Sequence, residues 1–187
     1  MMSFFSWIQN ADLSVLRFIR QNIANPVLDF LMPLVTLIGE DGILWIAAAI
    51  ALLCFKKTRK AGFVMGFSLL IGLVTVNLTI KPLVGRIRPY VLDDVPILVE
   101  SLGDGSFPSG HTTACFEAAV SLILCGYKKW GYVSLFAAFL VAFSRLYLYV
   151  HFPTDIITGA VIGTAAAFLS FFVVNKLYNK YEKSKTL

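Results

Sequence analysis

Long apolar runs constrain this chain more than any other feature of its sequence. Apolar residues make up 58% of the 187 residues and charged residues only 14%, and the mean hydropathy is +0.77. A soluble domain usually has about 45–50% apolar and about 25% charged residues, so this chain has too little polar surface to dissolve in water. Because an open strand edge cannot lie in lipid, membrane-spanning helices are the expected structure.

The apolar runs predict an all-α membrane protein of one domain, residues 1–187, with about six transmembrane helices. A bilayer core takes about 20 apolar residues per helix, and fewer where neighbouring helices shield the ends. The runs lie near residues 26–39, 42–55, 61–80, 112–127, 131–147 and 156–174. Run 26–39 is short and contains Asp29, so the sequence leaves open whether it crosses the bilayer fully.

Residues 1–24 are expected to form an amphipathic helix in the membrane interface. Polar residues interrupt this segment, and it lacks the apolar stretch and cleavage site of a signal peptide. Six of its apolar residues could share one side of a helix: Phe4, Phe5, Ile8, Leu13, Leu16 and Ile19.

The basic residues predict how the chain is oriented in the bilayer. If six spans alternate, twelve of the sixteen Lys and Arg residues fall on one side. By the positive-inside rule that side is the cytoplasm, and both termini are expected there. The twelve are Arg17, Arg20, Lys56, Lys57, Arg59, Lys60, Lys128, Lys129, Lys176, Lys180, Lys183 and Lys185. Since their positions explain the net charge of +5, no nucleic-acid partner is expected.

The remaining four cations, Lys81, Arg86, Arg88 and Arg145, are predicted on the opposite, extracytoplasmic side. An outer loop without a binding function is expected to avoid Lys and Arg, so binding of an anion is the favoured reason for their presence there. The alternative is that they are helix-end charges that reach back to the membrane interface. Both histidines of the chain fall on this same side. Either histidine alone could be a packing residue, but the pair beside four cations indicates a site.

Three segments carry these residues: KPLVGRIRP at 81–89, FPSGH at 107–111 and SRLYLYVHFPTD at 144–155. Clustered Lys and Arg neutralise a phosphate, and Arg can bind it with two parallel hydrogen bonds. Backbone amides around Ser109 and Gly110, at the start of a helix, add donors for an anion. Gly110 also lets the backbone approach a ligand closely.

The histidines and a nearby aspartate suit phosphoryl transfer. A neutral imidazole can attack phosphorus and form a phosphohistidine, and a second imidazole can protonate the departing oxygen. Asp155 follows His151 by four residues and could set the tautomer of its ring, although Pro153 argues against a plain helical turn between them. No carboxylate cluster suited to Mg²⁺ or Zn²⁺ accompanies the site, so neither a metal nor a cofactor is expected.

The three segments resemble the signature of the type 2 phosphatidic acid phosphatase superfamily, KxxxxxxRP, PSGH and SRxxxxxHxxxD. Lys81, Arg88 and Pro89 match the first motif, and Pro108 to His111 match the second. The third motif is matched by Ser144, Arg145, His151 and Asp155. The motifs and the helix between them cover residues 81–155, and the flanking spans are consistent with the six-helix bundle of the family.

The resemblance implies a role for each matched position. His151 would be the nucleophile that becomes phosphorylated, Asp155 would orient it, and His111 would be the general acid. The residues implied to hold the phosphate are Lys81, Arg88, Ser109, Gly110 and Arg145. The motif leaves the roles of two residues open, Ser144 and Arg86, and for Arg86 the alternatives are a substrate contact and a solvated charge.

Other polar residues near the motifs are interpreted as structural. Glu117 should lie within a span, where an acid usually faces the bundle interior and has a partner, and a structural hydrogen bond is favoured over catalysis. For the acids between the first two motifs, a solvated loop is favoured over a role in substrate access or head-group recognition: Asp93, Asp94, Glu100 and Asp104.

The sequence thus predicts a membrane enzyme that removes phosphate from a lipid. Bacterial members of this size resemble undecaprenyl diphosphate phosphatases and phosphatidylglycerophosphate phosphatases. An outward-facing site favours the prenyl diphosphate; phosphatidylglycerophosphate and phosphatidic acid are the alternatives. Vanadium-dependent haloperoxidases share the residue set but are soluble and larger, and a non-enzymatic lipid-binding or transport protein is a remote alternative. The oligomeric state is not indicated.

Overall fold

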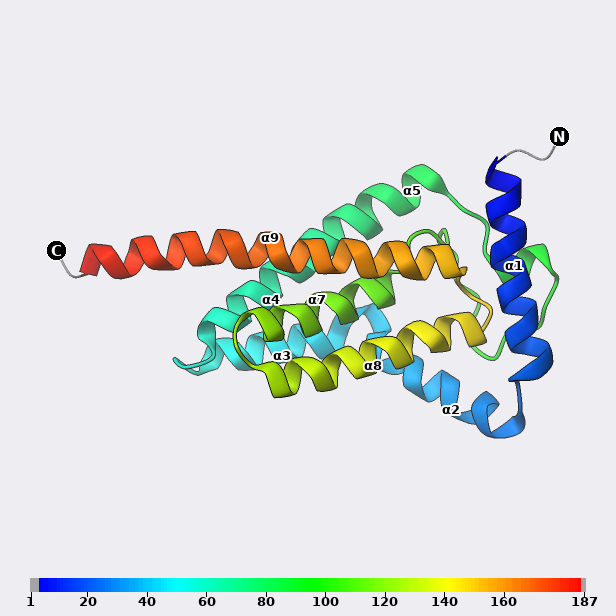
Figure 1. Cartoon of the computed structure of the whole chain (residues 1–187), viewed down its shortest axis with the longest axis horizontal. Coiled ribbons are helices and arrows are strands. Elements are labelled where there is room, and N and C mark those ends of the chain that lie inside the picture. The colour runs from blue at the N-terminus through cyan, green and yellow to red at the C-terminus, as the bar shows by residue number, and fades with distance from the viewer. Residues whose placement is uncertain (1–3, 186–187) are drawn as a thin grey trace.

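The computed structural model describes residues 4–185, and the chain there consists of helices and loops without a strand (Figure 1). Side chains are described for residues 6–180, so the predictions for the side chains of Phe4, Phe5, Lys183 and Lys185 lie outside the described residues. The expected all-α fold is confirmed. The helices are α1 Phe4–Asn22, α2 Pro26–Thr36, η1 Leu37–Gly42, α3 Ile43–Cys54, α4 Arg59–Gly72, η2 Leu73–Ile80, α5 Lys81–Val84, α6 Pro89–Leu92, α7 Gly110–Leu124, α8 Lys128–Tyr147 and α9 Pro153–Lys185.

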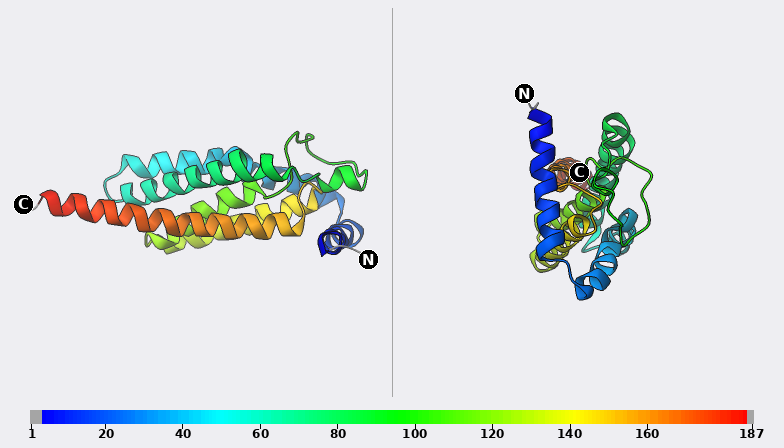
Figure 2. Two further views of the ribbon diagram at one scale, coloured as in Figure 1. Left: turned by 90° about the horizontal axis from the view of Figure 1, so that it is seen from above. Right: turned by 90° about the vertical axis from the view of Figure 1, so that its right-hand side faces the viewer.

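Most of the helices run along the long axis of an elongated bundle, with α7 at its centre (Figures 1 and 2). Helix α7 packs against α4, α8 and α9, and small residues such as Cys115, Ala118 and Ala119 are fully buried along it. Helix α7 has only 15 residues, fewer than the roughly 20 that span a bilayer core. It can be this short because neighbouring helices surround it.

Four helical stretches are long and apolar enough to cross a membrane: Pro26–Cys54, Arg59–Leu92, Lys128–Tyr147 and Pro153–Lys180. Apart from Phe55, the runs expected as two separate spans, 26–39 and 42–55, lie within the first of these stretches. A local kink joins them, where Glu40 leaves helical geometry and Asp41 has a φ of 45°. The expected number of about six spans is therefore not confirmed.

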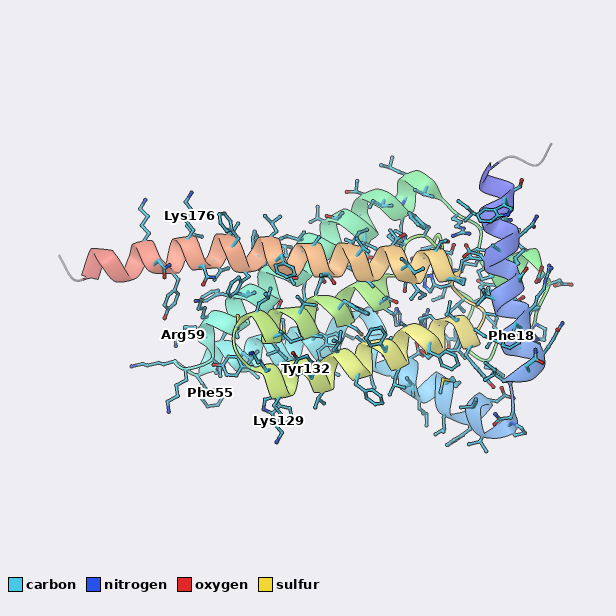
Figure 3. The ribbon with its side chains drawn as sticks, viewed as in Figure 1. Phe18, Phe55, Arg59, Lys129, Tyr132 and Lys176 are labelled. Atoms are coloured by element: carbon cyan, nitrogen blue, oxygen red, sulfur yellow. The ribbon has the colours of Figure 1, made fainter. Side chains whose placement is uncertain are left out.

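The outside of the bundle is apolar, whereas one of its ends is basic. Phe136, Phe139 and Phe172 are each more than half exposed along α8 and α9, which suits a surface that meets lipid. Figure 3 labels Arg59, Lys129 and Lys176 in the half of the bundle that lies away from α1. We call this the basic end; its residues are Lys56, Lys57, Arg59, Lys60, Lys128, Lys129, Lys176 and Lys180.

Helix α1 lies across the other end of the bundle, roughly perpendicular to the long helices (Figures 1 and 2). This orientation agrees with an interfacial helix. However, Arg17 of α1 pairs with Asp93 at 2.7 Å, and Asp12 pairs with Arg86 of the first motif at 2.8 Å. Helix α1 thus lies at the end of the bundle that carries the three motifs, which we call the motif end, while α9 runs toward the basic end. Residues Pro26–Cys54 of α2, η1 and α3 form one candidate membrane span and not two. The prediction that both termini are cytoplasmic stays a prediction.

The apolar stripe predicted for α1 faces the bundle and not the surrounding medium. Leu13 and Leu16 are buried against Tyr149 and Phe152, and Ile19 packs in a neighbouring cluster. Other apolar residues of α1, Trp7, Val15 and Phe18, are exposed. These three would be the residues of α1 in contact with lipid.

Candidate active site

The three predicted motifs meet at one cavity of about 480 Å³ at the motif end of the bundle. Lys81 begins α5, Gly110 and His111 begin α7, and Arg145 lies in the last turn of α8. His151 follows in the loop before α9. The cavity is lined by six of the predicted site residues: Lys81, Arg88, Gly110, His111, Arg145 and His151. The helical bundle therefore brings both histidines and three cations to a single site.

His151 is buried, and its two ring nitrogens have different surroundings. Nδ1 lies 3.4 Å from Oδ2 of Asp155, and this carboxylate also accepts a hydrogen bond of 2.9 Å from the Phe152 amide. Pro153 opens α9, so Asp155 reaches back from the first helical turn, as its spacing suggested. Nε2 lies 3.5 Å from Nη1 of Arg88, on the side of the cavity.

Burial lowers the pKa of His151 well below its ordinary value, and the nearby charges of Arg145 and Arg88 act in the same direction. The imidazole is therefore neutral at physiological pH. A neutral imidazole with one nitrogen oriented by a carboxylate and the other toward a cationic cavity can act as a nucleophile.

Asp104 pairs with Lys81 and Arg88, the two cations at specified positions of the first motif. Arg88 donates from Nη2 to Oδ1 of Asp104 at 2.6 Å and from Nη1 to the carbonyl of Val150 at 2.8 Å, while Lys81 pairs with Oδ2 of Asp104. Burial raises the pKa of Asp104, but the hydrogen bonds from Lys81 and Arg88 outweigh it and bring the pKa to about 2. The expectation that Asp104 is simply solvated is therefore wrong.

Arg145 and His111 each present a nitrogen that no described residue satisfies. Arg145 donates from Nη1 to Oγ1 of Thr36 at 2.7 Å, but its buried Nε has no hydrogen-bond partner in the described part of the chain. The same holds for Nε2 of His111, which lies 3.6 Å from a carboxylate oxygen of Glu40. Buried polar atoms are normally hydrogen-bonded, so both nitrogens are suited to receive an oxyanion.

Ser109 and Ser144 have structural contacts and do not line the cavity. Ser109 caps α7 by accepting hydrogen bonds from the amide of Thr112 at 3.4 Å and its hydroxyl at 3.0 Å, and the Ser109 amide donates to the carbonyl of Asp155 at 3.1 Å. The amide expected to bind an anion is therefore occupied. Ser144 donates to the carbonyl of Val141 at 2.7 Å.

Gly110 does line the cavity, and its lack of a side chain has a local reason. A Cβ atom at this position would lie 3.0 Å from Oδ1 of Asn77, which also lines the cavity.

Arg86 fits neither of the two alternatives considered for it. Its Nη1 donates to Oδ1 of Asp155 at 2.6 Å, and its Nη2 donates to Oδ2 of Asp12 at 2.8 Å. The guanidinium also lies over the ring of Phe152, 3.8 Å from its centroid, and Arg86 does not line the cavity. Arg86 therefore supports Asp155 from the side away from the cavity.

Asp12 and Glu40 are functional candidates that the sequence did not suggest. Both lie far from the motifs in the chain, and neither belongs to a recognisable local pattern, since Asp12 is a single acid of α1 and Glu40 is followed only by Asp41. Only folding brings Asp12 to Arg86 and Glu40 to His111.

The cavity extends from the cations between apolar side chains of α3, α4 and η2, namely Ile46, Leu69, Leu70, Leu73 and Val76. Glu117 also lines it and is buried. Its carboxyl group lies so close to Gly72 that a Cβ atom added to this glycine would be 2.3 Å from Oε1 of Glu117. Oε1 has no hydrogen-bond partner among the described residues. A polar end and an apolar extension are the features that a phosphorylated lipid requires.

Comparison with known proteins agrees with this geometry. Residues 60–179 match the PAP2 superfamily. An undecaprenyl-diphosphatase of Sulfolobus acidocaldarius is 35% identical over 127 residues, which cover 67% of this chain and 61% of that protein. Undecaprenyl-diphosphatase BcrC of Bacillus subtilis is 30% identical, over 79% of this chain and 75% of that protein. Phosphatidylglycerophosphatase B of the same organism is also 30% identical, over 94% and 87%.

Solved structures resemble the fold as a whole. The crystal structure of Aquifex aeolicus LpxE superposes with a TM-score of 0.76 at 27% identity, over 86% of this chain and 94% of that one. A PAP2-type phosphatidylglycerolphosphate phosphatase from Bacillus subtilis gives a TM-score of 0.71 at 29% identity, over 93% and 87%. With its helical fold, its cationic cavity and these relatives, the chain belongs to the PAP2 superfamily of membrane phosphatases.

Proposed function

We propose that this protein removes the terminal phosphate of undecaprenyl diphosphate through a phosphohistidine intermediate on His151. One observation carries this proposal: a single cavity joins three cations and two imidazoles at one end to an apolar extension at the other. The cations Lys81, Arg88 and Arg145 would hold the phosphate oxygens, and the apolar part would take the beginning of the lipid chain. This arrangement uses positive side chains where other phosphatases use metal ions.

In the first step, Nε2 of His151 would attack the terminal phosphorus. A P–N bond forms while the bond between phosphorus and the bridging oxygen breaks, and the lipid monophosphate leaves. Asp155, 3.4 Å from Nδ1, would keep the ring in the tautomer that frees Nε2 and would stabilise the positive charge that develops on it. His111 would donate a proton to the leaving oxygen.

In the second step, water would attack the phosphohistidine and release inorganic phosphate. His111, now without its proton, would accept one from the water. Glu40, whose carboxylate lies 3.6 Å from Nε2 of His111, would favour the protonated form of this ring before the first step and after the second.

The choice of undecaprenyl diphosphate is supported by the two relatives named undecaprenyl-diphosphatase. It is also supported by the charge distribution, because the basic end would face the cytoplasm under the positive-inside rule. The motif end would then open on the extracytoplasmic side of the cell membrane, where a carrier lipid released by wall synthesis would be dephosphorylated.

Phosphatidylglycerophosphate is the second candidate. The relative named phosphatidylglycerophosphatase B aligns over 94% of this chain, and a solved phosphatidylglycerolphosphate phosphatase shares the fold at a TM-score of 0.71. Its diacylglycerol chains would use the same apolar extension of the cavity.

A panel of lipid phosphates tests the proposal. Purified protein should release phosphate from undecaprenyl diphosphate faster than from phosphatidylglycerophosphate or phosphatidic acid, and turnover should continue with EDTA present. His151→Ala should lower kcat by more than about 1,000-fold, because it removes the nucleophile. Full turnover by this variant would refute the mechanism, and a preference for phosphatidylglycerophosphate would favour the second candidate.

A further inference from the structure

Helix α1 contributes a buried carboxylate next to the catalytic motifs, although it lies outside the residues that match the family. Asp12 is only 4% exposed. Its Oδ2 accepts from Nη2 of Arg86 at 2.8 Å and from the hydroxyl of Thr154 at 2.5 Å. Its Oδ1 accepts from the Thr154 amide at 3.1 Å. A carboxylate with three hydrogen bonds, one of them to a cation, is held in one orientation.

Arg86 joins this carboxylate to the one that contacts the predicted nucleophile. Its guanidinium donates to Asp12 from one terminal nitrogen and to Asp155 from the other, at 2.8 and 2.6 Å. The planar fork of an arginine fixes the angle between such partners. The other oxygen of Asp155 lies 3.4 Å from Nδ1 of His151, so an unbroken series of contacts runs from α1 to the imidazole.

The charges explain why the series needs both carboxylates. Asp12 and Asp155 are 4% and 0% exposed, and Arg86 is the cation that pairs with both. Buried ion pairs depend strongly on geometry, and removing one member leaves the others undercompensated. Without Asp12, Nη2 of Arg86 loses its carboxylate partner. The guanidinium would then no longer hold Asp155 in the same position.

We propose that Asp12 is a positioning residue that, through Arg86 and Asp155, sets the orientation of His151 for attack on phosphorus. This inference rests on the proposed role of His151. It gives α1 a part in the reaction itself, in addition to its location across the end of the bundle (Figure 1).

The same helix offers a matched control. Arg17 of α1 also reaches the motif end, where it donates two hydrogen bonds to Asp93 at 2.7 and 2.9 Å. This pair fastens α1 to the loop after α6, but it does not touch Asp155 or line the cavity. Arg17→Gln therefore weakens the attachment of α1 without affecting the contacts of Arg86.

The experiment compares Asp12→Asn, Asp12→Glu and Arg17→Gln with undecaprenyl diphosphate and phosphatidylglycerophosphate as substrates, with rates normalised to the folded, monodisperse fraction. Asp12→Asn should lower kcat by roughly tenfold to a hundredfold, the range for residues that orient a reacting group. KM should change by less than about twofold, because the cavity cations keep their contacts. Formation of the phosphoenzyme in a single turnover should slow by the same factor as kcat.

Two further results distinguish positioning from simple docking of α1. Asp12→Glu, which keeps the charge, should recover part of the rate, and Arg17→Gln should retain the kcat of the unaltered protein. In an Arg86→Met background, Asp12→Asn should have no additional effect on kcat, because its influence passes through Arg86.

Equal losses in Asp12→Asn and Arg17→Gln would overturn the proposal, and so would additive effects of the Asp12 and Arg86 substitutions. Failure of the proposed function is recognised separately. If His151→Ala stays active, the mechanism itself is wrong. If His151→Ala is inactive while Asp12→Asn has normal kcat, only the role of Asp12 is wrong.

Discussion

At the scale of single residues, Asp104 stands where a phosphate would be expected to bind. It pairs with Lys81 and Arg88, and its pKa of about 2 keeps it ionised at any ordinary pH. Its side chain is about half exposed, so it can move away when a substrate arrives. A carboxylate in this position preserves the charge balance of the cavity and competes with the phosphate for the same two cations.

Asp104→Asn is therefore expected to strengthen substrate binding. Removal of the competing charge should lower KM for the lipid phosphate by roughly fivefold, which corresponds to about 1 kcal/mol for a partly exposed ion pair. The measurement is steady-state phosphate release in detergent micelles. Asp94→Asn is the control, because Asp94 is an exposed acid of the same loop, and Asn tolerates its positive φ of 49°. A higher KM in Asp104→Asn would instead indicate that the carboxylate positions Lys81.

At the scale of secondary-structure elements, the contact between α7 and α9 determines how the second and third motifs meet. Two glycines of α9 allow the helices to approach closely. A Cβ atom at Gly159 would lie 2.7 Å from the carbonyl oxygen of Ser109, and one at Gly163 would lie 2.5 Å from that of Thr113. Small residues four apart are a frequent means of close helix packing in membranes. Here this packing holds the start of α7 beside Asp155.

Gly163→Ala should destabilise the protein by about 1–3 kcal/mol, the usual cost of overpacking. The added methyl group cannot avoid the backbone of α7, so α9 must shift. Thermal unfolding of the purified protein in detergent measures this effect as a lower midpoint. Gly66→Ala in α4 is the comparison, since outside the neighbouring backbone of its own helix nothing lies within 4 Å of its Cβ position. If both variants unfold at the same temperature, close packing of α7 and α9 does not contribute to stability.

At the scale of the whole molecule, charge and hydrophobicity divide the bundle into three zones. The basic end contains Lys56, Lys57 and Lys60 among others, while the middle exposes large apolar side chains. The motif end contains the cavity and α1. Tyr127 donates to the carbonyl of Lys57 at 2.7 Å. The turn between α3 and α4 and the turn between α7 and α8 therefore lie side by side at the basic end. Such a molecule can be placed in a bilayer in two orientations, and the positive-inside rule favours one of them.

Cysteine labelling in intact cells measures this orientation. In a background without Cys54, Cys115 and Cys125, a membrane-impermeant maleimide should react with Glu100→Cys, in the exposed loop at the motif end. It should react with Lys57→Cys only after the membrane is permeabilised. The reverse pattern would place the cavity on the cytoplasmic side and would remove one of the reasons for choosing undecaprenyl diphosphate.

The helical fold, the membrane environment and six of the residues that line the polar end of the cavity could be inferred from the amino-acid sequence. Hydropathy is a property of neighbouring residues, and the three motifs have fixed internal spacings, so His111, His151 and Lys81 could be identified without coordinates. The same reasoning predicted that Asp155 reaches the ring of His151, because only four residues separate them.

The distant residues that complete the site could be identified only from the folded chain. Asp12, Glu40 and Asp104 carry single charges whose partners lie in other segments, and no local periodicity encodes such contacts. The end of the bundle at which α1 lies follows from the path of residues 26–54, which form one candidate membrane span. This path includes a kink at Glu40 and Asp41 and packs against α7 and α8. Neither the hydropathy of the run nor its length contains this information.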